Sequence, residues 1–110
     1  MRIEPTSDFQ HKAKRLGKKY RSLDADIAQL GQELSVNPRL GTPLGRDCYK
    51  IRFQISSKNR GKSSGGRVVT CVKIVRDTVY LLTIFDKSEK SALDETELDE
   101  MLQAAGISDI

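Results

Sequence analysis

The sequence predicts a single α+β domain over residues 1–110, in which an N-terminal helical hairpin packs on a twisted antiparallel sheet of three to four strands and a C-terminal helix follows. Three observations support this prediction. Two segments near the N-terminus place apolar residues at helical spacing, the middle of the chain alternates apolar and polar residues, and an acidic segment near the C-terminus returns to helical spacing. A chain of 110 residues, 37% of them hydrophobic, can bury one modest core.

The two N-terminal helices are expected to form a hairpin, because only a tight connection separates them. Their apolar positions are Phe9, Ala13, Leu16 and Tyr20 in the first helix, and Leu23, Ile27, Leu30 and Leu34 in the second. Thr6 or Ser7 can cap the first helix, and Ser22 can cap the second. Asn37-Pro38 ends the second helix, because the residue before a proline avoids the helical conformation.

The central stretch, residues 49–73, contains two alternating strands joined by a loop that carries cations and glycines but no carboxylate. Successive side chains of a strand point to opposite faces, so Lys50 and Arg52 lie on the face opposite to Ile51 and Phe53. In the second strand, Arg67 lies on the side opposite to the apolar row formed by Val68, Thr70, Val72 and Ile74. The predicted sheet therefore has one apolar face and one cationic face, and the cationic face suits a polyanion.

The remaining segments complete the predicted fold. Residues 2–4 favour a short edge strand closed by proline, and residues 79–85 favour a third alternating strand. The segment from Arg39 to Asp47 is expected to be a loop because of its glycines and proline. Asp94 and Glu97 predict a capping box for the terminal helix, which Gly106 should end.

The net charge of +4 conceals a strong asymmetry along the chain. Residues 1–76 contain 17 Lys and Arg against 6 Asp and Glu, whereas residues 77–110 contain 2 against 9. A basic body of this kind suits nucleic acid or another acidic partner, because phosphate contacts release counterions. Lysines on the first helix are equally well explained by solubility. Cations within the predicted strands point more directly to binding.

Several other classes of protein and site are disfavoured. No apolar run approaches a membrane span and the N-terminus lacks the apolar segment of a secretion signal, so we expect a cytoplasmic protein. Cys48 and Cys71 are expected to be free thiols in a reducing compartment, although their place on the cationic face of neighbouring strands makes oxidation conceivable. The single histidine, His11, excludes a histidine-pair ribonuclease and a Ser-His-Asp triad. We expect no metal site.

The loop between the two central strands carries Gly61-Lys62-Ser63, which is part of the pattern of a nucleotide-binding phosphate loop. That pattern also requires a glycine where Ser56 stands, and a helix where residues 67–75 favour a strand. We therefore exclude nucleoside triphosphate binding. The loop cations Lys58, Arg60 and Lys62 are instead predicted to contact nucleic acid.

The order of these features resembles the RelE/HigB/ParE superfamily of bacterial type II toxins, particularly its HigB-like and RelE-like branches. The resemblance covers nearly the whole chain and depends on the helical hairpin, Asn37-Pro38, a Leu-Gly loop, residues 48–52 (CYKIR), residues 66–69 (GRVV), residues 80–89 (YLLTIFDKSE) and an acidic terminal helix.

The resemblance implies a toxin that enters the ribosomal A site, cleaves messenger RNA without a metal or cofactor, and is neutralised by a cognate antitoxin. In such enzymes the 2′-hydroxyl attacks the adjacent phosphate, which needs a proton acceptor, a proton donor and cations around the phosphate. By position, Lys50 and Arg52 match the basic pair of the first central strand and Arg67 matches the phosphate-binding arginine. Lys87 falls near a second basic residue after the last strand.

The chain also departs from the family pattern. No tyrosine follows Tyr80, where RelE-like members carry one in the terminal segment, and residues 85–87 (FDK) stand where other branches place histidine. The base is therefore open: a lysine held neutral by surrounding cations, Lys50 or Lys87, or else Asp86. A ParE-like inhibitor of DNA gyrase and a catalytically inactive, partner-binding relative are the alternative functions.

Overall fold

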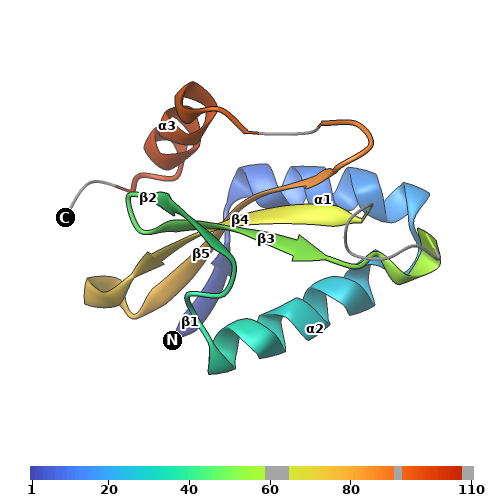
Figure 1. Cartoon of the computed structure of the whole chain (residues 1–110), viewed down its shortest axis with the longest axis horizontal. Helices are drawn as coiled ribbons and strands as arrows, with labels where there is room; N and C mark the ends of the chain where they lie inside the picture. The colour runs from blue at the N-terminus through green and yellow to red at the C-terminus, as the bar shows by residue number, and fades with distance from the viewer. Residues whose placement is uncertain (59–64, 91–92, 108–110) are drawn as a thin grey trace.

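A computed structural model of the chain describes residues 1–58, 65–90 and 93–107. Its elements, in chain order, are β1 (Arg2–Pro5), α1 (Ser7–Lys19), α2 (Leu23–Val36), β2 (Thr42–Gly45), β3 (Cys48–Phe53), β4 (Gly66–Lys73), β5 (Thr78–Asp86) and α3 (Glu95–Ala104). The strands form one sheet in the order β1-β5-β4-β3-β2. Figure 1 shows α2 and α3 on opposite sides of this sheet. The predicted α+β architecture is confirmed.

Both N-terminal helices form as predicted, but only the first has the predicted side-chain cap. The Thr6 hydroxyl accepts the Phe9 N–H at 3.3 Å and donates to the Leu81 carbonyl at 3.0 Å, which ties the start of α1 to β5. The expectation for Ser22 is wrong, because its backbone is already helical (φ −84°, ψ −5°) and its side chain makes no capping bond. Its hydroxyl donates instead to Asp26 at 2.7 Å.

The sheet has five strands, more than the three to four predicted, and it is mixed. The expected edge strand at the N-terminus forms β1, which runs parallel to β5. The segment that was expected to be a loop contains β2, an exposed edge strand where Pro43 is tolerated because no further strand needs its N–H. Arg46 and Asp47 both have positive φ, as the two-residue turn between β2 and β3 requires.

Side chains from the two faces of the sheet form two separate cores. The core under α1 and α2 includes Phe9, Leu16, Leu30, Leu34, Phe53, Val68 and Ile84. The core under α3 includes Cys48, Val69, Cys71, Leu82, Leu98, Leu102 and Ile107. The predicted capping box of Asp94 and Glu97 begins α3, and Gly106 (φ +69°) follows its end. One sheet face is therefore covered by the hairpin, while α3 packs on the other.

Gly66, the first residue of β4, leaves no room for a side chain beside Phe53 of β3. A Cβ atom added at Gly66 would lie 2.3 Å from Cε1 of the buried Phe53 ring, far inside van der Waals contact. We expect Gly66→Ala to lower the free energy of unfolding by about 1–3 kcal/mol, measured by urea denaturation, because the ring must shift within a packed core.

Gly17 provides the matched control for that substitution. A Cβ added there meets nothing within 4 Å, and the residue lies inside α1. Gly17→Ala should therefore raise the free energy of unfolding by about 0.5–1 kcal/mol through helix propensity. Equal effects of the two glycine substitutions would contradict the packing described for Phe53.

Candidate nucleic-acid interface

Lys50, Arg52, Arg67 and Lys87 form what we call the cationic end of the sheet. Arg52 and Arg67 are directly opposed in the β3–β4 register, so their side chains leave the same face. Lys50 precedes Arg52 by two residues and therefore shares this face. Val69, two residues after Arg67, packs in the core under α3. The cationic end thus occupies the α3 side of the sheet.

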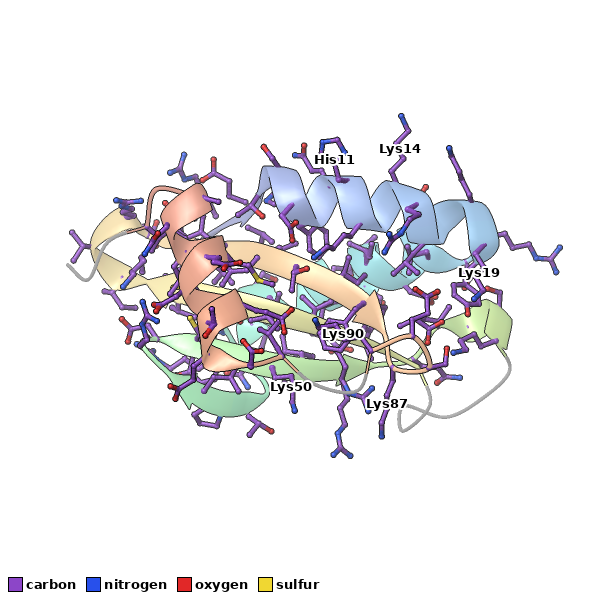
Figure 2. The ribbon with its side chains drawn as sticks, turned by 90° about the horizontal axis from the view of Figure 1, so that it is seen from above. His11, Lys14, Lys19, Lys50, Lys87 and Lys90 are labelled. Carbon is purple, nitrogen blue, oxygen red and sulfur yellow. The ribbon has the colours of Figure 1, made fainter. Side chains whose placement is uncertain are left out.

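Lys87 joins this end because the β4–β5 ladder continues one residue past the strand. Its N–H donates to the Gly65 carbonyl at 3.2 Å, and its side chain is exposed. Figure 2 shows α3 over one part of the face, with Lys50 and Lys87 extending toward the same side of the molecule, while His11 and Lys14 extend from α1 on the opposite side. The structure therefore brings the four predicted catalytic residues to one region.

Burial differs sharply among these cations. Arg52 is exposed, Lys50 is half-buried and Arg67 is only 3% exposed. Burial, and secondarily the charge of Arg52, lowers the pKa of Arg67. Its Nη1 donates to the Gly66 carbonyl at 2.9 Å. An anion between the two guanidinium groups would relieve their repulsion, and their planar forks suit phosphate oxygens. An incoming phosphate would contact Arg52 first, because Arg52 is exposed. Contact with the buried Arg67 requires neighbouring side chains to shift.

Of the three cations that the sequence places in the loop, only Lys58 lies within the described residues. Lys58 lies in the short 3-10 turn Ser56–Lys58, where its Nζ is 2.9 Å from Oδ1 of the buried Asp86 and its side chain is 11% exposed. A buried carboxylate therefore already binds the ammonium group of Lys58, and contact of Lys58 with nucleic acid stays a prediction. Arg60 and Lys62 lie outside the described residues.

Asp86, the rival proton acceptor, is completely buried. Its carboxylate accepts hydrogen bonds from the Tyr20 hydroxyl at 2.5 Å, Lys58 Nζ at 2.9 Å and the Ser88 N–H at 3.0 Å. Burial raises the pKa of Asp86, but the bonds from Tyr20 and Lys58 outweigh burial and hold that pKa well below its usual range. Such a carboxylate is a very weak base, and it does not face the solvent. Asp86 is therefore excluded as the general base.

Sequence reasoning missed this Tyr20–Asp86–Lys58 network. Its signals were an aspartate immediately after an apolar strand and a tyrosine at the end of the apolar row of α1. A carboxylate at such a position is buried and needs partners.

A hollow of about 180 Å³ that sequence reasoning also missed opens beside Phe85, between α1, β5 and the segment that leads to α3. Lys12, Arg15, Lys90 and Glu89 contribute the charged part of its lining. Phe85 is the direct partner of Arg67 in the β4–β5 register, so the hollow adjoins the cationic end. The two together offer cations for a phosphate and a recess with an aromatic wall next to them.

Within residues 1–58, 65–90 and 93–107, no three His, Cys, Asp or Glu side chains gather in a way that would hold a metal ion. None of the helices in these ranges combines the length and apolar character needed to span a membrane.

No known protein-family model matches the sequence. Among solved structures, the chain is similar to a double arginine-to-alanine mutant of the E. coli toxin RelE in its free state, with a TM-score of 0.60 and 19% identity over 96% of this chain and 93% of that one. The chain adopts the RelE fold. The isolated E. coli RelE toxin gives a TM-score of 0.57 and 18% identity over 93% of this chain and 96% of its own. The resemblance noted in the sequence is thus confirmed at the level of the RelE fold.

Proposed function

We propose that this chain is the toxin of a type II toxin–antitoxin pair and that it cleaves messenger RNA in the ribosomal A site. The observation that carries the proposal is the opposition of Arg52 and Arg67, with Lys50 beside them, on a sheet of the RelE fold. Fold alone does not determine function, whereas the side chains of this site indicate what the protein can bind. The exposed Arg52 and the half-buried Lys50 suit contact with the phosphodiester backbone of RNA, and the buried Arg67 joins them once neighbouring side chains shift.

The proposed reaction is an internal transesterification. The 2′-hydroxyl attacks the adjacent phosphorus, the bond from phosphorus to the 5′ oxygen breaks, and a 2′,3′-cyclic phosphate and a 5′-hydroxyl are formed. Arg52 and Arg67 hold the non-bridging oxygens, where negative charge accumulates in the transition state. Lys50 and Lys87 transfer protons at the 2′ and 5′ oxygens. The hollow beside Phe85 receives a base next to the scissile phosphate.

Two partners follow from the proposal. The ribosome presents the message in a bent, single-stranded form, which a shallow cationic surface can engage. A cognate antitoxin covers the cationic end in the resting cell, because an uncovered basic surface binds nucleic acid indiscriminately.

The test is to add the purified chain to ribosomes programmed with a defined message and to map the new 5′ ends. We expect cleavage within the A-site codon and little cleavage of the same RNA without ribosomes. Lys50→Ala should reduce the cleavage rate about 10²-fold or more, since it removes a proton-transfer group.

Lys14→Ala is the matched control, because Lys14 is an exposed cation on the opposite side of the molecule (Figure 2). It should leave the cleavage rate unchanged. Growth arrest with intact messages and a DNA-damage response would favour a ParE-like gyrase inhibitor instead. Absence of any growth effect would favour an inactive, partner-binding protein.

A further inference from the structure

Two thiols face each other where β3 and β4 pass beneath α3. Cys48 and Cys71 are directly opposed in the β3–β4 register. The Val72 N–H donates to the Asp47 carbonyl at 2.9 Å, so the ladder bonds flank the cysteine pair instead of joining it. In a pair of this type the Cα atoms are roughly 4.5 Å apart, which lies within the roughly 4.4–6.8 Å that disulfides span. The backbone is therefore already spaced for a bond between the two residues.

The side chains also converge. Both thiols point at the Arg46 carbonyl oxygen, with Cys48 Sγ at 3.4 Å and Cys71 Sγ at 3.9 Å. Both cysteines are free and almost fully buried, with exposures of 1% and 0%. Two sulfur atoms that share one acceptor can bond to each other after a small rotation of each side chain.

We propose that Cys48 and Cys71 form a reversible cross-strand disulfide when the protein meets a two-electron oxidant of the peroxide class. This makes the pair a modification site beneath α3. The proposal does not depend on the ribonuclease activity, since neither cysteine belongs to the cationic end. Failure of one proposal therefore leaves the other standing.

The surroundings assign different roles to the two thiols. When Cys71 ionises, the Cys48 thiol can donate to the Cys71 sulfur instead of to the Arg46 carbonyl, which lowers the pKa of Cys71 by more than burial raises it, and the nearby Lys73 ammonium lowers it further. The same hydrogen bond, together with burial, raises the pKa of Cys48. The Cys48 Sγ also lies closer to its acceptor, the Arg46 carbonyl oxygen, than the Cys71 Sγ does, at 3.4 Å against 3.9 Å, so Cys71 is the first nucleophile and Cys48 keeps its proton until the second step.

The chemistry balances in two steps. The Cys71 thiolate attacks one peroxide oxygen, the O–O bond breaks, and the departing hydroxide takes a proton to become water, which leaves a sulfenic acid on Cys71. Cys48 then attacks the Cys71 sulfur, loses its proton and displaces hydroxide as a second water. Two thiols are oxidised by two electrons in total, and one peroxide is reduced to two waters.

The position of the disulfide predicts what limits its formation and how it changes the stability of the fold. Leu98, Leu102 and Ile107 pack in the same core as the two cysteines, so an oxidant reaches the thiols only when α3 moves. The disulfide would close a loop that contains Lys50, Arg52 and Arg67. Because it fits the existing strand register, it should raise the melting temperature by roughly 5–10 °C.

The experiment treats the reduced, purified full chain with hydrogen peroxide and follows it by thiol titration, by intact mass without reductant and by thermal melting. We expect loss of both titratable thiols, a monomer lighter by two hydrogen atoms, and a higher melting temperature that a dithiol reductant reverses. Leu98→Ala should speed the oxidation by loosening α3, without changing the product. Cys48→Ser and Cys71→Ser should each prevent the bond and the rise in melting temperature.

Three results would overturn the proposal. They are persistence of both thiols in the wild type and in Leu98→Ala, addition of oxygen atoms without loss of hydrogen, and dimers linked between chains.

Discussion

Replacing Arg67 by methionine should reduce cleavage of ribosome-bound message about 10²–10³-fold, the usual cost of removing one group that stabilises charge in a transition state. The same substitution should change the melting temperature little, because loss of the Nη1 bond to the Gly66 carbonyl opposes the relief of a buried charge. Burial and the charge of Arg52 lower the pKa of Arg67, which means that the folded protein disfavours its charged form. Methionine retains the buried aliphatic volume without that charge.

A loss of cleavage without a loss of melting temperature would show that Arg67 acts in the reaction. A structural role would lower both. Arg67→Lys keeps the charge but loses the planar fork, so its cleavage rate should fall between those of the wild type and Arg67→Met. Cleavage would be measured in a single turnover, with thermal melting of the same samples. Full activity of Arg67→Met, or a large fall in its melting temperature, would contradict the role assigned to Arg67.

Local patterns in the sequence were enough to predict the helices, the central strands and the shared face of the cations. The helical spacing from Phe9 onward and the alternation from Tyr49 onward each depend on neighbouring residues alone. Once two alternating strands pair, Arg52 and Arg67 must share a face if the register aligns them, and it does. The cationic end was therefore predictable from alternation together with one hairpin.

What sequence reasoning missed depends on contacts between distant residues. The strand β2 exists because Thr42 pairs with Lys50 at the sheet edge, although Pro43 and Gly45 predict a loop. Lys58 was counted with the loop cations because no local pattern shows that it reaches Asp86, 28 residues away. Tertiary contacts of this kind override local propensity. They also changed the interpretation of Asp86 from a candidate base to a buried acceptor.

The role of Asp86 as a buried acceptor predicts a large loss of stability when its charge is removed. Asp86→Asn should lower the free energy of unfolding by about 3 kcal/mol at neutral pH, since removal of one partner of a buried ion pair leaves the other charge uncompensated. Lys58 would lose its counter-ion, and the Tyr20 hydroxyl would lose a charged acceptor at 2.5 Å. Glu89→Gln is the matched control, because Glu89 pairs with Lys19 at 3.4 Å on the exposed surface. Its effect should stay within about 1 kcal/mol.

The pH dependence tests the cause of this effect. The folded protein holds the pKa of Asp86 well below its usual range, so the carboxylate stabilises the fold fully above the unfolded-state pKa of about 3.9. That contribution is lost as the pH falls through the folded-state pKa. Urea denaturation from pH 7 down to pH 3 should therefore show a steeper loss of stability in the wild type than in Asp86→Asn. Parallel curves would mean that the carboxylate charge does not stabilise the fold, and that the loss in Asp86→Asn comes from altered packing alone.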